Sequence, residues 1–126
     1  MAELNAIGIV VSDMARSIRF YRLLGLDFPE TPDEGHLEAT LAGGTRLMLD
    51  SEETVRSFRP DWTREVGNQL ALAFECGSAA EVDELYARVV DAGFQGEKLP
   101  WDAFWGQRYA QLLDPDGNPI DLYAPL

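Results

Sequence analysis

The sequence is poor in cysteine and in long apolar runs, and each shortage excludes a class of protein. Its single cysteine, Cys76, excludes an intrachain disulfide and any metal site built from several cysteines. No stretch approaches the roughly 18 consecutive apolar residues that a membrane-spanning helix requires. The first residues, MAELNAIGIVV, lack the basic, apolar and small-residue order of a signal peptide. We therefore expect a cytoplasmic protein with no membrane partner.

Basic residues are also scarce, since 10 lysines and arginines stand against 22 acidic residues and leave a formal net charge of −12. A charge of this sign repels nucleic acid and attracts cationic ligands. It also serves the simpler purpose of keeping a protein soluble. The chain of 126 residues is long enough for one domain with a core and too short for two ordinary domains. We expect one domain over residues 1–126 with no nucleic-acid partner.

The first half of the chain predicts a strand, a helix and two further strands. Residues 7–11, IGIVV, form an apolar run rich in β-branched side chains. The helix follows the N-cap candidates Ser12 and Asp13, carries apolar residues at helical spacing, and ends at Gly25. Two short strands, joined by a glycine turn, are then predicted at residues 36–41 and 45–49.

The second half predicts the same order of elements. It begins with a strand at residues 70–74, and SAAE at residues 78–81 has the spacing of a capping box. The amphipathic helix that follows is closed by Gly93, and an irregular loop leads on from it. Two further strands are predicted, residues 108–113 before the turn DPDGN and residues 119–123 after it. This repeat predicts an α+β fold in which two modules pack around a concave cleft.

Three segments resemble the vicinal oxygen chelate superfamily, which contains glyoxalases, extradiol dioxygenases, fosfomycin-resistance thiol transferases and bleomycin-resistance proteins. They are LNAIGIVVSDMARSIRFYRLLGLDF, LALAFECGSAAEVDELYARVVDAGF and WGQRYAQLLDPDGNPIDLYAPL, and together they cover most of the chain. The resemblance implies two βαβββ modules in a half-open barrel, and a dimer with clefts built across its interface. Module one would span about residues 1–52, a connecting loop residues 53–67, and module two about residues 68–126.

The metal enzymes of this superfamily place ligands at four equivalent strand positions, of which this sequence keeps one. By resemblance these positions are Ala6, Met48, Ala71 and Asp121. The alanines cannot coordinate a metal, and a thioether is too soft for Mg²⁺, Mn²⁺ or Fe²⁺. A catalytic metal needs about three protein ligands, and the sole histidine, His36, makes only a pair with Asp121. We therefore expect neither a metal nor another cofactor.

The replaced ligands predict a wider and more apolar cleft, for which nine residues are candidate ligand contacts. Strand alternation places Arg46 and Tyr123 on the same side as Met48 and Asp121. All three tryptophans lie in two stretches predicted to be irregular, where their rings suit a planar ligand. Alternatively, these rings close the barrel ends or build the dimer contact. The candidates are His36, Arg46, Met48, Trp62, Trp101, Phe104, Trp105, Asp121 and Tyr123.

Two classes of function fit these residues. The first is a metal-free binding protein that sequesters an aromatic antibiotic or other natural product, as bleomycin-resistance proteins do in drug resistance or self-protection. The acidic charge would favour a cationic ligand. The second is a glyoxalase- or dioxygenase-type enzyme, metal-free or with an atypical metal site, in which Asp121 or His36 would transfer protons. The missing metal ligands favour the binding protein, and the identity of its ligand does not carry over from the resemblance.

Overall fold

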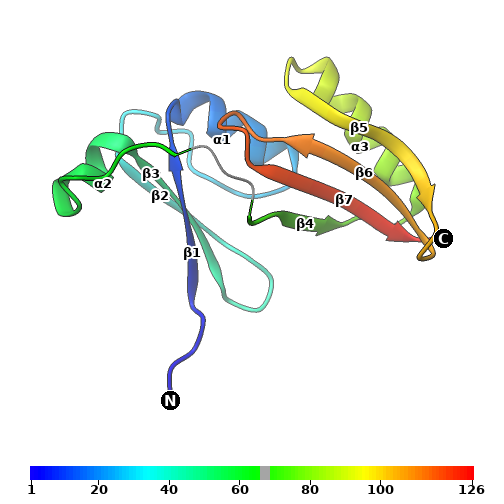
Figure 1. Ribbon diagram of the computed structural model, residues 1–126, viewed down its shortest axis with the longest axis horizontal. Coiled ribbons are helices and arrows are strands. Elements are labelled where there is room, and N and C mark those ends of the chain that lie inside the picture. Colours follow the sequence, from blue (N-terminus) through cyan, green and yellow to red (C-terminus); the bar gives the residue numbers. More distant parts are fainter. Residues whose placement is uncertain (66–68) are drawn as a thin grey trace. The chain divides into compact units, whose positions relative to one another are not determined.

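The computed structural model describes residues 1–65 and 69–126, which divide into two compact units, Met1–Glu65 and Val66–Leu126 (Figure 1). In chain order, the first unit contains β1 (Ala6–Val11), α1 (Met14–Leu23), β2 (His36–Thr40), β3 (Arg46–Ser51) and α2 (Glu52–Phe58). Its strands form a mixed sheet in the order β1-β3-β2, in which β1 runs parallel and β2 antiparallel to β3.

The second unit repeats the plan with one more strand. It contains β4 (Leu72–Glu75), α3 (Ala79–Asp91), β5 (Gln95–Ala103), β6 (Gln107–Leu113) and β7 (Pro119–Pro125). The sheet order is β4-β7-β6-β5, with β4 parallel to β7 and the other neighbours antiparallel. This unit therefore has the βαβββ order, whereas the first unit has two strands after its helix. In the described parts of the chain the strands form two separate mixed sheets and no closed barrel.

Helix α1 is held at both ends by the residues that the sequence predicts. The Asp13 side chain accepts a hydrogen bond of 3.1 Å from the backbone N–H of Arg16, which is an N-cap contact. The chain leaves the helix through Gly25 at φ 92°, a conformation that residues with a Cβ rarely adopt. The helix buries Ile18 and Tyr21, and the sheet contributes a matching apolar layer of Val11, Leu37, Leu47 and Leu49.

Helix α3 begins with the predicted capping box. Ser78 Oγ accepts from the Glu81 N–H at 3.2 Å, and Glu81 Oε2 accepts from the Gly77 N–H at 2.7 Å. The helix contacts β5, β6 and β7, as Figure 1 shows, and its buried Val82 and Val89 lie against one face of the sheet. That face is formed by the fully buried side chains of Ala110, Leu112, Ile120, Leu122 and Ala124.

The DPDGN turn between β6 and β7 is confirmed in detail. Asp114 Oδ1 accepts hydrogen bonds from the backbone N–H groups of Asp116 and Asn118, at 2.9 and 2.8 Å. Its Oδ2 accepts from the Asn118 side chain at 2.8 Å, and Gly117 has φ 83°. This turn sets the register of β6 against β7, and so decides which residues face away from α3.

Three predicted elements differ from the structure. Helix α2, Glu52–Phe58, lies almost entirely within the predicted loop 53–67. It has only seven residues and one buried apolar side chain, Val55, too little for a helical period to be read. Strand β5 replaces the loop predicted around Trp101, because register shifts at residues 96–98 and 98–101 break the alternation that identifies a strand. Strand β4 begins at Leu72, two residues after its predicted start, so Ala71 lies before the strand. Its partner β7 begins with Pro119, which has no N–H with which to extend the pairing.

The helices are short. The longest in the described residues, α3, has 13 residues, and none there is long and apolar enough to cross a membrane.

Candidate functional site

The face of the second sheet that α3 leaves uncovered carries a row of aromatic side chains from three adjacent strands. The register places Trp101 of β5 opposite Tyr109 of β6, and Tyr109 opposite Tyr123 of β7. We call these three residues the aromatic row. Glu75 of β4 lies opposite Tyr123 and ends the row. Each of the three rings is partly exposed, so the row presents a continuous apolar surface of aromatic rings.

The turn between β5 and β6 extends this surface. Its Trp105 ring lies 6.1 Å from Trp101 and 5.2 Å from Tyr109 between centroids, both edge to face. Phe104 contacts Trp105 at 5.0 Å and is otherwise almost free in solvent, at 97% exposure. The Trp105 Nε1–H donates to Gln107 Oε1 at 2.8 Å, which orients the indole. Four of the nine predicted candidates, Trp101, Phe104, Trp105 and Tyr123, thus belong to one aromatic surface.

Asp121, the fifth candidate in this unit, is bound to the aromatic row by a hydrogen bond. The Tyr109 hydroxyl donates to Asp121 Oδ2 at 2.5 Å. Burial first, and then this bond, raise the pKa of Tyr109 to about 12, so the hydroxyl stays protonated at physiological pH. Asp121 therefore already has a donor from within the chain, which weakens the expectation that it anchors a ligand cation alone.

A cation also lies on the aromatic row. The Nζ atom of Lys98 is 3.8 Å from the centroid of the Trp101 ring, well inside the range of a cation–π contact. The register opposes Lys98 to Gln111, which lies two residues from Tyr109 on β6 and therefore on the same face. The aromatic surface thus has a positive group at its β5 edge and a carboxylate, Glu75, at its β4 edge.

Sequence reasoning missed Tyr109 and Lys98. Tyr109 lies in QRYAQLL, where alternation with the buried Ala110 and Leu112 would have placed it on the same face as Gln107 and Gln111. Nothing local indicates Lys98, because the bulges in β5 decide which way it points.

Three other positions named from the sequence, Ala6, Arg46 and Met48, lie on one face of the first unit's sheet. The register sets Ala6 opposite Arg46, and Gly8 opposite Met48. A Cβ at Gly8 would lie 3.5 Å from Met48 Cε, so the thioether methyl lies over this glycine.

His36 and Arg46 are both engaged with partners across β2 and β3. The two ring nitrogens of His36 bond Asp50 at 2.5 Å and Glu38 at 2.7 Å. Arg46 donates to Glu38 at 2.8 Å and to Asn5 at 2.8 Å. The Glu38 and Asp50 carboxylates raise the pKa of His36, and His36 followed by Arg46 lowers the pKa of Glu38. The two carboxylates favour the doubly protonated ring, so His36 must lose a proton before it can act as a base toward a ligand.

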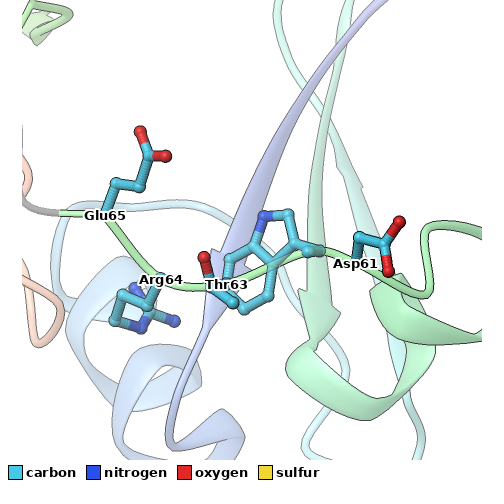
Figure 2. Close-up of a pocket in the computed structure, with 5 residues that line it drawn as sticks. Asp61, Thr63, Arg64 and Glu65 are labelled. Atoms are coloured by element: carbon cyan, nitrogen blue, oxygen red, sulfur yellow. The ribbon is translucent and has the colours of Figure 1, made fainter.

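Trp62 belongs to the first unit, in the segment that follows α2. The guanidinium carbons of Arg56 and Arg64 are 5.3 and 5.5 Å from its ring, and both arginines pair with Glu52. A cavity of about 450 Å³ is lined by Asp61, Trp62, Thr63, Arg64 and Glu65. Figure 2 shows the Arg64 and Glu65 side chains leaving this segment on opposite sides. The electron-rich ring therefore already has cationic partners within the chain.

The described residues offer no group of three histidine, cysteine or acidic side chains placed to hold a metal ion. Burial first, and then the charge of Glu81, raise the pKa of Cys76, which disfavours the nucleophilic thiolate.

The model of the Glyoxalase/Bleomycin resistance protein/Dioxygenase superfamily matches residues 3–122 of the chain. The chain belongs to this superfamily. It is 26% identical to an uncharacterized protein of Bacillus subtilis (strain 168), YwkD, over 131 residues that cover 98% of this chain and 97% of that protein. The fold agrees with this assignment, because the second unit has the superfamily's βαβββ order.

Solved structures of superfamily members have the same fold. A glyoxalase/bleomycin resistance protein/dioxygenase family enzyme from Burkholderia phytofirmans PsJN is similar with a TM-score of 0.85 and 21% identity, covering 99% of this chain and all of the other. A glyoxalase-related enzyme from Fulvimarina pelagi gives a TM-score of 0.84 at 21% identity, covering 98% of this chain and 88% of the other. At these identities the likeness shows the fold alone.

The metal that superfamily enzymes carry does not fit the residues found here. Ala6 and Ala71 have no donor atoms, and Ala71 lies outside β4. Met48 offers a thioether over Gly8, and Asp121 accepts from Tyr109. Hard divalent ions need several oxygen or nitrogen ligands, which these four positions do not supply.

Proposed function

We propose that this superfamily member is a metal-free binding protein that sequesters an aromatic antibiotic or other natural product, in drug resistance or self-protection. The aromatic row is its main contact surface. The observation that carries the proposal is the alignment of Trp101, Tyr109 and Tyr123 across three strands on the face that α3 does not cover. Partly exposed aromatic rings in contact with each other suit a planar ligand, because stacked and edge-to-face contacts add to the hydrophobic effect.

The expected gain from such a surface is large enough to measure. Each aromatic pair contributes about 0.5–1.5 kcal/mol beyond the burial of area. A ligand that contacts all three rings of the row therefore gains roughly 1.5–4.5 kcal/mol, or about one to three orders of magnitude in Kd. Loss of one ring should weaken binding by roughly three- to tenfold.

Tryptophan fluorescence tests this proposal directly. The chain has three tryptophans, so the double variant Trp62→Phe, Trp105→Phe reports on Trp101 alone. We expect at least one compound in a panel of polycyclic and glycopeptide antibiotics to quench Trp101 and to raise the melting temperature. The matched variant that keeps only Trp62 should show much weaker quenching, because Trp62 lies outside the aromatic row.

Substitution then separates binding from folding. Trp101→Leu should weaken the best compound at least threefold while the protein keeps its cooperative melting transition. A panel that neither quenches Trp101 nor shifts the melting temperature would contradict the proposal. If a compound quenches the variant that keeps only Trp62 as strongly as the variant that keeps only Trp101, the site lies in the first unit. Met48, His36 and Arg46 are the remaining candidates there.

A glyoxalase- or dioxygenase-type enzyme is the second candidate, and the similar structures from Burkholderia phytofirmans and Fulvimarina pelagi, each described as an enzyme, favour it. Stoichiometric zinc, nickel, manganese or iron in the purified protein would support this candidate over the binding protein. In a metal-free enzyme, Asp121→Asn should abolish turnover and leave binding intact.

The remaining features form part of the same proposal. We infer one domain at a cytoplasmic address, in which the two modules form a half-open barrel and two chains form a homodimer with clefts across the interface. Light scattering in solution tests the dimer, and a monomer at micromolar concentration would contradict it. A crystal structure tests whether the aromatic row lines the cleft.

A further inference from the structure

Lys98 is the only lysine of the chain. Its Nζ lies 3.8 Å from the centroid of the Trp101 ring. Among the described residues of its own unit, 69–126, no carboxylate lies within ion-pair distance of this ammonium group, although acidic residues outnumber basic ones in the chain by 22 to 10. Within the described part of the second unit, the aromatic row therefore carries a positive charge without an anionic partner.

Two acidic side chains on β5 and β7, Asp102 and Asp121, have partners within the unit, and Glu75 lies at the far edge of the sheet. Asp121 accepts the hydroxyl of Tyr109 at 2.5 Å. Asp102 is paired with Arg108 at 3.1 Å, and Arg108 also binds Asp83. Glu75 stands on β4, opposite Tyr123 and three strands away from Lys98. The polar character of the surface thus runs from positive at the β5 edge to negative at the β4 edge.

We propose that the ligand of this surface is an aromatic acid, whose fused rings lie along the aromatic row and whose anionic group binds the Lys98 ammonium. This inference rests on the function proposed above and specifies the chemistry of its ligand. Neighbouring strands are about 4.8 Å apart, so the row from β5 to β7 spans roughly 10 Å. That length matches two or three fused rings. Because the Lys98 ammonium lies over the Trp101 ring, fused rings on Tyr109 and Tyr123 that end beside Trp101 would bring a carboxylate at their edge within reach of Lys98.

The proposed ligand is anionic, whereas a protein with a net charge of −12 attracts cationic ligands. The long-range field acts through solvent and is screened over about 8 Å at physiological ionic strength. An ion pair at Lys98 acts at contact distance beside apolar rings, where water competes less. Local charge therefore decides which ligand is held, and the net charge affects mainly how fast ligands arrive.

Three naphthalene probes of similar size and different charge test the proposal. They are naphthoate, naphthylmethylammonium and naphthylmethanol, titrated against the full chain by Trp101 fluorescence and by calorimetry. We expect naphthoate to bind about tenfold more tightly than the ammonium probe, with the neutral alcohol between them. In Lys98→Met, which keeps the apolar stem, naphthoate should lose about tenfold in affinity while the alcohol is unaffected. Lys98→Arg should keep most of the naphthoate affinity.

Arg88→Met is the matched control, because it removes an exposed positive charge from α3, which covers the other face of the sheet. It should leave all three affinities unchanged. Equal binding of the three probes, or equal losses in Lys98→Met and Arg88→Met, would overturn the aromatic acid and leave the proposed function standing. Tighter binding of the ammonium probe would overturn it in favour of a cationic ligand near Asp121. Failure of all three probes to bind would remove the proposed function of this surface as well.

Discussion

Replacing Tyr109 by phenylalanine tests the bond that joins the aromatic row to Asp121. The substitution keeps the ring and its contacts with Trp101, Trp105 and Tyr123, and removes only the hydroxyl that donates to Asp121 at 2.5 Å. Hydrogen bonds to charged groups contribute about 1.5–3 kcal/mol when well shielded from water. The pair is only partly buried, so we expect the free energy of unfolding to fall by about 1 kcal/mol near neutral pH.

The raised pKa of Tyr109 adds a dependence on pH. Burial and the bond to Asp121 raise it from 10.0 to about 12. Between these values the unfolded chain has lost a proton that the folded chain keeps, so the stabilisation is complete below pH 10 and is lost as pH rises toward 12. A difference of about 2 in pKa corresponds to about 2.7 kcal/mol, and solvent screening at a partly exposed face reduces this to about 1 kcal/mol.

Urea unfolding of the wild type and of Tyr109→Phe, near neutral pH and at about pH 11, measures both effects. The gap between the two proteins should be about 1 kcal/mol near neutral pH and should narrow at the higher pH. Tyr123→Phe is the matched control, since Tyr123 stacks on Tyr109 at 6.2 Å and no described hydrogen bond involves its hydroxyl. A gap that is absent near neutral pH, or that stays constant at high pH, would refute the reasoning.

Three further predictions concern stability. Because the pKa of His36 is raised, its bonds to Glu38 and Asp50 stabilise the fold below pH 6.5, and this stabilisation is lost as pH rises through the raised pKa. His36→Gln should therefore remove this pH dependence of the unfolding free energy, measured in urea from weakly acidic to weakly basic pH. Leu122→Ala, at a side chain with 0% exposure, should cost about 2–5 kcal/mol in unfolding free energy, whereas Leu126→Ala, at 64% exposure, should change it by less than about 0.5 kcal/mol. Addition of zinc, nickel or manganese should leave the melting temperature unchanged, and a saturable rise would show a metal site that the described residues do not reveal.

Local sequence predicted those features whose physical cause is also local. The caps at Asp13 and Ser78 and the DPDGN turn each depend on side chains that bond the backbone two to four residues away. Short-range geometry of this kind is encoded in the spacing of residue types. The repeated strand and helix order followed from the same signals, whereas the resemblance to the superfamily rested on three longer segments of the sequence.

The candidate site was predicted less completely, because its residues meet across strands. Trp101, Trp105 and Tyr123 were named as ligand contacts, and the structure brings them together through Tyr109, which was not. Asp121 was named as a ligand contact without a partner in the chain, but Tyr109, twelve residues away on β6, donates a hydrogen bond to it. His36 and Arg46 were named as ligand contacts, but both are bonded to carboxylates or amides of their own unit.

The residue sequence alone was enough to predict the superfamily and the order of most elements, because these depend on residue identity and short-range spacing. Only the tertiary structure decided which charges are paired and which face each ring occupies. Strand register and the two irregularities in β5 turn Lys98 toward Trp101 and set Tyr109 between Trp101 and Tyr123. The register and the irregularities in β5 depend on hydrogen bonding between distant segments. A register shift of one residue would turn every side chain of a strand to the opposite face of the sheet.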